Sequence, residues 1–303
     1  MKKNILVTIL IIIIPFIVVS LFVRTDEIKF HYASNLVIRV KDAANDKIVK
    51  VPFEEYVKGV LAGEIPTSFD LEALKAQAVA ARSYVLVQKE KNKENDYDVV
   101  NTVTNQVYLT DKQLKEKWKD DYEDKMNKIK SAVVATKGEY LSYDGKVVEA
   151  LFFSTSTGKT ENSEEVFSSK VPYLRSVSST WDEASPVYED SVALSINDFY
   201  NKLGLEYSDE VKTEVLETTS TGRVKKIKIN GIELFGRDVA TKLSLRSNYF
   251  EIIQNGDKIV INTKGYGHGV GMSQYGALGM AKEGYKYDEI LKHYYLGTEI
   301  KKM

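Results

Sequence analysis

One carboxyl group, that of Glu64, lies in surroundings that suit acid–base chemistry. Residues 60–66 carry no other charge. An apolar environment disfavours the ionised form of a carboxyl and raises its pKa, as a general acid near neutral pH requires. We therefore take Glu64 as the candidate catalytic acid/base, although a surface glutamate at the end of a helix would give the same local pattern.

Two cations, Lys75 and Arg82, lie seven residues apart in an alanine-rich stretch. Seven residues are about two helical turns, so a helix would place both cations on one face. That face also carries Val79 and Leu86. The cations could therefore bind an anionic or polyhydroxylated ligand, and an ordinary solvated helix edge is the alternative.

A glycine-rich stretch at residues 264–280 holds further candidates. Glycine occupies every second position from 265 to 271, so a strand here would lack side chains on one face and would let a ligand or another backbone approach closely. The spacing fits neither a phosphate-binding loop nor the dinucleotide fingerprint. His268 lies among these glycines, where it could contact a ligand or be structural. Ser273 is expected to cap a following helix.

The composition restricts the other kinds of chemistry. The chain has no cysteine and only three histidines, His31, His268 and His293. We therefore expect no disulfide, no thiol chemistry, no metal and no cofactor. Nothing resembles the motif of a nucleophilic serine. The formal net charge of -1 gives no indication of a nucleic-acid partner.

Periodicity, capping residues and turn signals predict the elements that must position these residues. Helices are expected at residues 52–63, 70–91, 114–135, 195–203, 273–282 and 287–296. Strands are expected at residues 36–40, 48–51, 224–229, 231–235 and 259–262, and as a pair within 140–155. The pattern indicates an α+β fold, in which mixed helices and an antiparallel sheet form a substrate cleft and residues 190–250 form a small inserted subdomain.

The N-terminal segment predicts a membrane anchor. Lys2 and Lys3 precede residues 5–23, a run of 19 residues without charge. As a helix this run would span ~28 Å, close to the hydrocarbon thickness of a bilayer. A cleaved signal peptide is the alternative, but no small-x-small pattern ends the run. The expected organisation is a cytoplasmic tip and transmembrane helix at 1–24, a juxtamembrane linker at 25–35 and an extracytoplasmic catalytic domain at 36–303.

Several stretches, in order along residues 36–302, resemble the stage II sporulation protein D (SpoIID) family. They are residues 51–66, 74–84, 104–108 (Thr-Asn-Gln-Val-Tyr), 153–156, 242–246 and 265–276. The resemblance implies a lytic transglycosylase that cleaves peptidoglycan glycan strands stripped of stem peptides, leaving 1,6-anhydro ends, during forespore engulfment. The family's catalytic glutamate falls on Glu64 and its helix arginine on Arg82, with Lys75 on the matching stretch.

The resemblance also implies partners and a location. The partners are the glycan strands, the cell-wall amidase SpoIIP and the membrane protein SpoIIM, and the location is the membrane at the sporulation septum. The residues expected to bind the strand are Lys75, Arg82, Ser154, Thr155, His268, Gln274 and Tyr275. Many members carry His and Cys where this chain has Phe153 and Ser156, and in some members these bind zinc, so no zinc is expected here.

Three alternatives to this function remain. The first is a glycan-binding adaptor that recruits or stimulates a cell-wall amidase without cutting the strand. The second is a structural component of the septum. The third is a zinc hydrolase, which the small number of histidines and the absence of cysteine disfavour.

Overall fold

The computed structural model describes residues 35–303, and these residues belong to one compact unit. The anchor predicted at residues 1–24 lies outside the described residues, as does all but the last residue of the linker predicted at 25–35. Within the described part, no helix combines the length and the apolar character needed to cross a bilayer.

Helices and short strands alternate along the described chain. The elements up to residue 184 are β1 (Val37–Lys41), β2 (Ile48–Pro52), α2 (Phe53–Glu64), α3 (Leu71–Lys91), β3 (Val99–Val100), α4 (Asp111–Trp118), η1 (Lys119–Asp121), α5 (Tyr122–Ala135), β4 (Glu139–Tyr143), β5 (Lys146–Val147), β6 (Phe152–Phe153), α6 (Ser163–Val166) and η2 (Thr180–Ala184). The later elements are β7 (Glu189–Ser195), α7 (Ile196–Leu203), β8 (Thr213–Thr218), β9 (Val224–Ile229), β10 (Ile232–Phe235), α8 (Gly236–Lys242), β11 (Phe250–Asn255), β12 (Lys258–Lys264), β13 (Met272–Ser273), α9 (Gln274–Lys282), α10 (Tyr287–Tyr294) and β14 (Glu299–Lys302).

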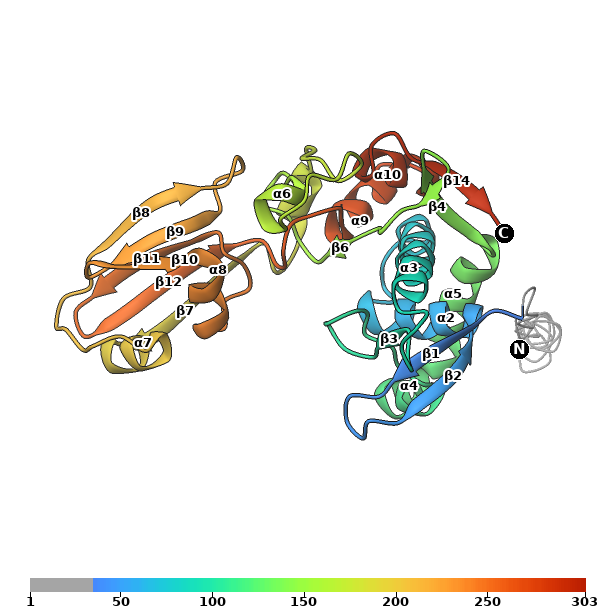
Figure 1. Cartoon of the computed structure of the whole chain (residues 1–303), viewed down its shortest axis with the longest axis horizontal. Helices are drawn as coiled ribbons and strands as arrows, with labels where there is room; N and C mark the ends of the chain where they lie inside the picture. Colours follow the sequence, from blue (N-terminus) through green and yellow to red (C-terminus); the bar gives the residue numbers. More distant parts are fainter. Residues whose placement is uncertain (1–34) are drawn as a thin grey trace, which may run out of the picture. The chain divides into compact units, whose positions relative to one another are not determined.

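The alanine-rich helix α3 is central to the packing of the other helices. Asp70 accepts a hydrogen bond from the Glu72 N–H and caps its start, as predicted. The alanines at positions 73, 76, 78, 80 and 81 are fully buried. Their small side chains let α2, α5, α9 and α10 contact α3, and Figure 1 shows α9 and α10 beside it. Helices from residues 53–64 and from residues 274–294 therefore meet at α3.

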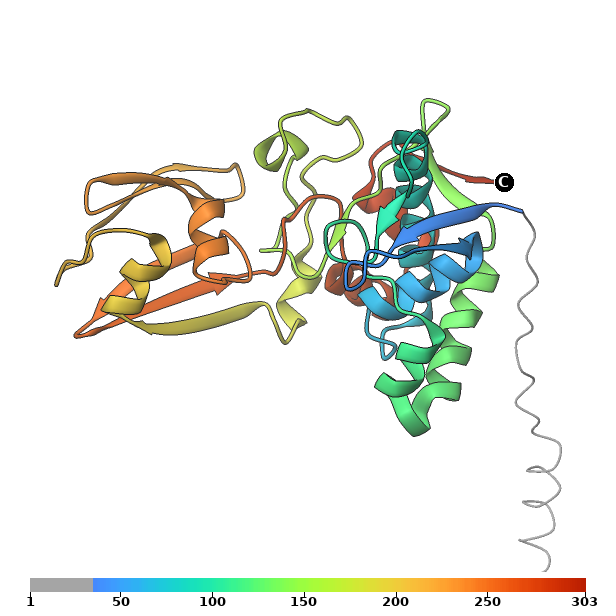
Figure 2. The same cartoon turned by 60° about the horizontal axis from the view of Figure 1, so that its bottom comes forward.

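Residues 189–264 form a lobe with a hydrophobic cluster of its own. Its two three-stranded antiparallel sheets have the orders β10-β9-β8 and β11-β12-β7. Together with α7 and α8 they enclose buried residues such as Phe199 and Ile261. The lobe is drawn in yellow to orange in Figures 1 and 2. The subdomain predicted at 190–250 falls within this stretch, which extends to Lys264 because β12 pairs with β7 over their whole lengths.

The fold is mixed α+β, as predicted, but it has several small sheets instead of one antiparallel sheet. The hairpins β1–β2 and β9–β10 occur where their patterns predicted them. Within residues 140–155 only β4 and β5 pair with each other. β6 pairs in parallel with β13, which no local pattern could have indicated.

The single helix predicted at residues 114–135 is wrong. α4 ends at Trp118 and α5 begins at Tyr122. Lys119 between them has a φ of +48°, a conformation that no α-helix can include. Neither glycine nor proline marks the break, so the sequence pattern did not show it.

The glycine-rich stretch does not form a strand between β12, which ends at Lys264, and β13, which begins at Met272. The four alternate glycines from 265 to 271 have φ values between +71° and +100°, which L side chains rarely adopt. The expected close approach of another backbone does occur. A Cβ on Gly271 would clash with the Leu151 carbonyl oxygen. The stretch is therefore a series of tight bends that lie directly against the chain around β6.

Candidate active site

Glu64 is the last residue of α2, and a loop that follows β3 holds its side chain. Oε1 accepts a hydrogen bond of 2.5 Å from the Val107 N–H. The Glu64 carbonyl oxygen accepts one of 3.2 Å from Gln274 Nε2 at the start of α9. Gly63 allows this arrangement, because a Cβ at that position would clash with the Val107 carbonyl oxygen. Two segments far away in the sequence therefore fix the position of the glutamate.

Burial and one backbone hydrogen bond determine the pKa of the Glu64 carboxyl. Burial raises the pKa of the carboxyl above its ordinary value of 4.5, and the Val107 N–H, which favours the anion, limits the rise. The carboxyl therefore keeps its proton to a higher pH than an exposed glutamate would. No group within residues 35–303 donates a hydrogen bond to Oε2, so this oxygen can interact with a ligand.

A cleft of about 960 Å³ lies beside Glu64. Aromatic side chains make up much of its wall, namely Tyr84, Phe152, Phe153, Phe167, Tyr173, Tyr266 and Tyr275. The volume is at the upper end of the range for small-molecule sites. Aromatic rings offer flat apolar faces, and tyrosine adds a polar edge. The cleft therefore suits a ligand made of flat rings that carry polar groups.

Four predicted binding residues share this cleft with Glu64: Ser154, His268, Gln274 and Tyr275. The parallel pairing of β6 with β13 brings them together. The Tyr275 N–H donates to the Ser154 carbonyl oxygen at 3.0 Å, which joins the start of α9 to the segment after β6.

Arg82 does not line the cleft, contrary to its predicted role in substrate binding. Its side chain is fully buried. Nη2 and Nε donate to the Glu54 carboxylate at 2.7 and 3.1 Å. Two further hydrogen bonds reach Thr136 Oγ1 and the Val133 carbonyl oxygen. The guanidinium therefore joins α2, α3 and the end of α5, and no substrate can reach it.

Lys75 and Thr155 also lie away from the cleft wall, contrary to the prediction. Lys75 Nζ pairs with Glu72 at 2.6 Å and lies 5.7 Å from the centre of the Tyr287 ring, where α3 meets α10. The two predicted cations of α3 are ~10 Å apart along its axis, so they contact different neighbours. Thr155 is fully buried, and its Oγ1 lies 3.0 Å from Ser185 Oγ.

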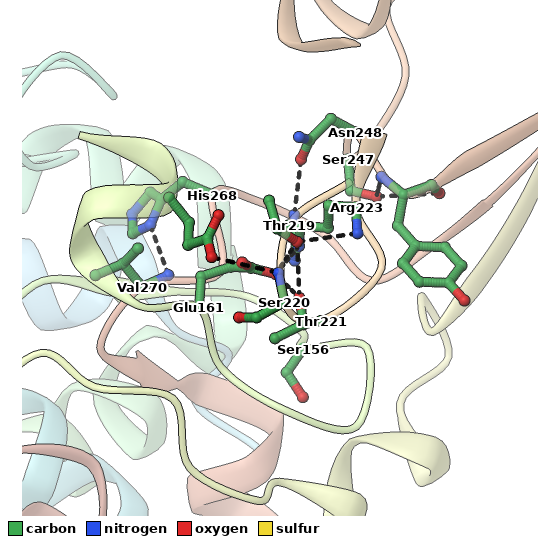
Figure 3. Close-up of polar contacts among 12 residues, drawn as sticks. Ser156, Glu161, Thr219, Ser220, Thr221, Arg223, Ser247, Asn248, His268 and Val270 are labelled. Carbon is green, nitrogen blue, oxygen red and sulfur yellow. Dashed lines mark hydrogen bonds and ion pairs between the residues drawn. The ribbon is translucent and has the colours of Figure 1, made fainter. Parts of the chain in front are cut away.

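His268 lies at the cleft wall between two aromatic rings. The ring centroids of Phe153 and Phe167 are 5.6 and 5.9 Å from its own. Its Nδ1 accepts a hydrogen bond of 3.1 Å from the Val270 N–H (Figure 3). Burial lowers the pKa of His268 to about 4, and the positive charge of Arg223 acts in the same direction. The imidazole is therefore neutral near pH 7 and acts there as a hydrogen-bonding group.

A buried ion pair supports the glycine-rich stretch (Figure 3). Arg223 Nε lies 3.2 Å from Glu161 Oε1, and both side chains are fully buried. Arg223 Nη1 donates to the Gly267 carbonyl oxygen at 2.8 Å. The Glu161 N–H donates to the Gly269 carbonyl oxygen at 2.7 Å. Because Arg223 belongs to the lobe at residues 189–264, the pair connects that lobe with the cleft wall.

The polar residues of the cleft that were not predicted from the sequence include Tyr84, Asn105 and Glu149. Tyr84 and Asn105 lie in two of the stretches that resemble the family, so the sequence did contain a signal that could have identified them as site residues. Glu149 lies in none of them. Its carboxylate accepts from Gln88 Nε2 at 2.6 Å and pairs with Lys91 Nζ at 2.7 Å, so both of its oxygens are already bound.

Phe153 and Ser156, where no zinc ligand was expected, contact other residues of the protein. Phe153 packs against the His268 ring. Ser156 Oγ donates to Asp182 Oδ2 at 2.8 Å. Across residues 35–303, no cluster of three or more His, Asp or Glu side chains is placed to hold a metal ion.

Known proteins are similar in sequence to this chain over most of its length. The profile of the family described as Stage II sporulation protein (SpoIID) matches residues 41–143. Stage II sporulation protein D of Bacillus subtilis (strain 168) is 44% identical over 273 residues, which cover 88% of this chain and 80% of that protein. Its counterpart in Bacillus amyloliquefaciens is 44% identical over 268 residues, or 87% of this chain and 78% of that protein. A protein named Amidase enhancer, from Bacillus subtilis (strain 168), is 32% identical over 299 residues, which cover 80% of this chain and 40% of that protein.

Proposed function

Because this chain belongs to the stage II sporulation protein D family, we propose that it is a peptidoglycan lytic transglycosylase. The proposed reaction cleaves the bond between N-acetylmuramic acid and N-acetylglucosamine in glycan strands stripped of stem peptides. It leaves 1,6-anhydro ends and takes place during forespore engulfment in sporulation.

The observation that carries this proposal is the state of Glu64. Its carboxyl lies on the wall of the aromatic cleft, burial raises its pKa, and Oε2 has no partner among residues 35–303. A glutamate of this kind can give a proton to a glycosidic oxygen near neutral pH and then take one back.

A single carboxyl is sufficient for this reaction. Most glycosidases need a second carboxyl, as nucleophile or as base for a water molecule. In the proposed reaction the C6 hydroxyl of the muramic sugar attacks its own anomeric carbon, and this intramolecular attack has a very high effective concentration. Glu64 protonates the leaving oxygen, and its carboxylate then accepts the C6 hydroxyl proton. No water is consumed. Glu149, the other carboxyl of the cleft, is held in contacts with Gln88 and Lys91.

The cleft residues have separate tasks in this proposal. Ser154, Gln274 and Tyr275 offer polar groups that position the strand. The neutral imidazole of His268 is held in the cleft wall by hydrogen bonds to the Val270 N–H and to the Phe152 backbone. The aromatic side chains pack against sugar rings. No cofactor is required, because the acid, the base and the nucleophile are all supplied by Glu64 and the substrate.

We also propose a location and partners, which rest on the N-terminal sequence and on the family resemblance. The protein is anchored in the cell membrane by one span within residues 1–24, with its catalytic domain on the extracytoplasmic face at the sporulation septum. It acts there on glycan strands together with the amidase SpoIIP and the membrane protein SpoIIM.

Replacing Glu64 with Gln tests the proposed reaction. Glutamine keeps the shape and can still accept the Val107 hydrogen bond, but it cannot donate an acid proton. We expect the release of 1,6-anhydro products from stripped strands to fall by at least ~10²-fold, as measured by mass spectrometry. Glu149→Gln, in the same cleft, is the matched control and is expected to have a much smaller effect. Parent-level release by Glu64→Gln is incompatible with the proposed role.

A second candidate function is a glycan-binding adaptor that stimulates a cell-wall amidase without cutting glycan. The similarity to the protein named Amidase enhancer favours it. An adaptor leaves the length of the glycan strands unchanged, whereas a transglycosylase shortens them and creates anhydro ends. The same mass spectrometry therefore separates the two functions.

A further inference from the structure

Residues 105–107 form a short strap beside α2 and α3, and each of them contacts one side chain of these helices. Asn105 Nδ2 donates to the Tyr84 phenolic oxygen at 3.1 Å, and the Val107 N–H donates to Glu64 Oε1 at 2.5 Å. Between these two contacts, Gln106 Oε1 accepts from the Tyr56 O–H at 3.0 Å. One tripeptide therefore positions Tyr84 relative to Glu64.

The orientation of the Asn105 amide is fixed by a second contact. Its Oδ1 accepts a hydrogen bond of 2.9 Å from the Val100 N–H. The Nδ2 group must therefore be the one that faces Tyr84, and the phenolic oxygen is an acceptor there. Within residues 35–303 no acceptor takes the phenolic hydrogen of Tyr84. This hydrogen is left for a ligand, because Tyr84 lines the same cleft as Glu64.

We propose that Tyr84 is a second catalytic residue of this cleft, whose phenolic O–H donates a hydrogen bond to the glycosidic oxygen that Glu64 protonates. The inference deepens the proposed transglycosylase function and rests on it. Tyr84 is buried, its O–H has no acceptor among residues 35–303, and it lines the same cleft as the Glu64 carboxyl. Because the Asn105 amide orients its oxygen, the hydroxyl has the arrangement of a preorganised donor.

The chemistry assigns a separate task to each group. As the glycosidic bond breaks, its electron pair moves to the leaving oxygen, where negative charge builds up until the Glu64 proton arrives. The Tyr84 O–H stabilises this charge and keeps its own proton, so no bond to Tyr84 forms or breaks. Burial raises the pKa of Tyr84, and the charges of Glu149 and Glu64 add to this, so the phenol stays protonated near pH 7.

Replacing Tyr84 with Phe in the full chain removes only the hydroxyl. A hydrogen bond to a group that gains charge in the transition state is worth roughly 10- to 100-fold in rate, so we expect kcat on stripped glycan strands to fall by that factor with KM little changed. The matched control is Tyr200→Phe. It removes the hydroxyl of a buried tyrosine that donates to the Glu210 carbonyl oxygen at 2.9 Å in the lobe at residues 189–264, outside the cleft, so it is expected to lower stability and leave kcat unchanged.

The outcomes of this experiment separate the inference from the function on which it rests. A selective loss of kcat in Tyr84→Phe, with unfolding as in the wild type, supports the catalytic role. Wild-type kcat in Tyr84→Phe overturns it while the transglycosylase function stands, and so does a rise in KM alone, since that shows a binding role only. A wild-type protein that forms no anhydro ends overturns both proposals.

Discussion

Two features of the Glu64 site shift the pKa of its carboxyl in opposite directions. Burial raises the pKa of the Glu64 carboxyl above 4.5, whereas the Val107 N–H stabilises the anion. General-acid catalysis needs the protonated form, so kcat is expected to fall as the pH rises through the raised pKa. The pH dependence of kcat on stripped strands measures this limb. A midpoint at or below 4.5 would contradict the prediction.

The stability of the fold offers a second measurement of the same pKa shift. Between the unfolded and the raised folded pKa, the folded state binds more protons than the unfolded chain, so stability falls as the pH rises through this window. Glu64→Gln does not ionise. Its free energy of unfolding in urea is therefore expected to increase relative to that of the wild type as the pH rises above 4.5. If the free energies of unfolding of the two proteins differed by the same amount at every pH in this range, the pKa of Glu64 would not be raised by burial.

The contrast between Glu64 and Arg82 shows what a sequence can reveal about single residues. The apolar surroundings of Glu64 could be predicted because they include its neighbours in the sequence. Arg82 was predicted to bind the substrate because the residue that it pairs with is not near it in the sequence. Glu54 lies 28 positions away, and only the packing of α2 against α3 brings the two side chains together. Tyr84 was missed for the same reason, since Asn105 comes from another element.

Elements were predictable where a local signal marks their ends. Asp70 caps α3 and Ser273 caps α9, and both helices begin where these residues predicted. The break at Lys119 has no such signal. The glycine-rich stretch indicated close packing correctly but not its conformation, because alternate glycines fit a strand and a series of bends equally well.

The contact between α2 and the strap leads to a prediction about Gly63. Alanine is a better helix former than glycine by about 1 kcal/mol, so helix propensity alone predicts that Gly63→Ala stabilises the protein. The Cβ would clash with the Val107 carbonyl oxygen, however, and would push the strap away from Glu64. We expect a net loss of about 1–3 kcal/mol in the free energy of unfolding, together with a loss of kcat.

The control for Gly63→Ala is Gly145→Ala, in the turn between β4 and β5. A Cβ there would meet nothing within 4 Å, but the φ of +72° strains any L side chain. This variant is expected to lose about 1 kcal/mol of stability and to keep full activity. Urea unfolding and kcat, measured for both variants, distinguish a displaced strap from general destabilisation. A stabilised and fully active Gly63→Ala would show that the strap does not lie against α2.

On the scale of the whole molecule, a cleft was predicted, but the combination of segments that forms its wall could not be read from the sequence. Its wall combines the end of α2, the strap, the segment around β6, the glycine-rich stretch and the start of α9. Periodicity describes each of these segments separately and gives no information on which of them meet. Most of these segments contain one of the stretches that resemble the family. The parallel pairing of β6 with β13 explains why the segment around β6 lies beside the start of α9.

The ion pair between Arg223 and Glu161 joins the lobe at residues 189–264 to that wall, and it leads to the last prediction. Arg223→Met would leave the Glu161 carboxylate fully buried without its counter-charge, so the free energy of unfolding is expected to fall by about 3–5 kcal/mol. The double variant Arg223→Met/Glu161→Gln removes both charges. It is expected to recover part of the loss, because no buried charge is left unpaired.

Equilibrium unfolding in urea measures this effect, and a second arginine pair supplies its control. Arg175 lies 2.6 Å from Glu164, but side-chain exposures of 19% and 36% leave this pair in contact with solvent. Arg175→Met is therefore expected to cost less than about 1 kcal/mol. If the double variant at positions 161 and 223 were no more stable than Arg223→Met, the loss would come from packing and not from an unpaired charge. Loss of the Arg223 contact to Gly267 is also expected to lower kcat, because it loosens the stretch that carries His268.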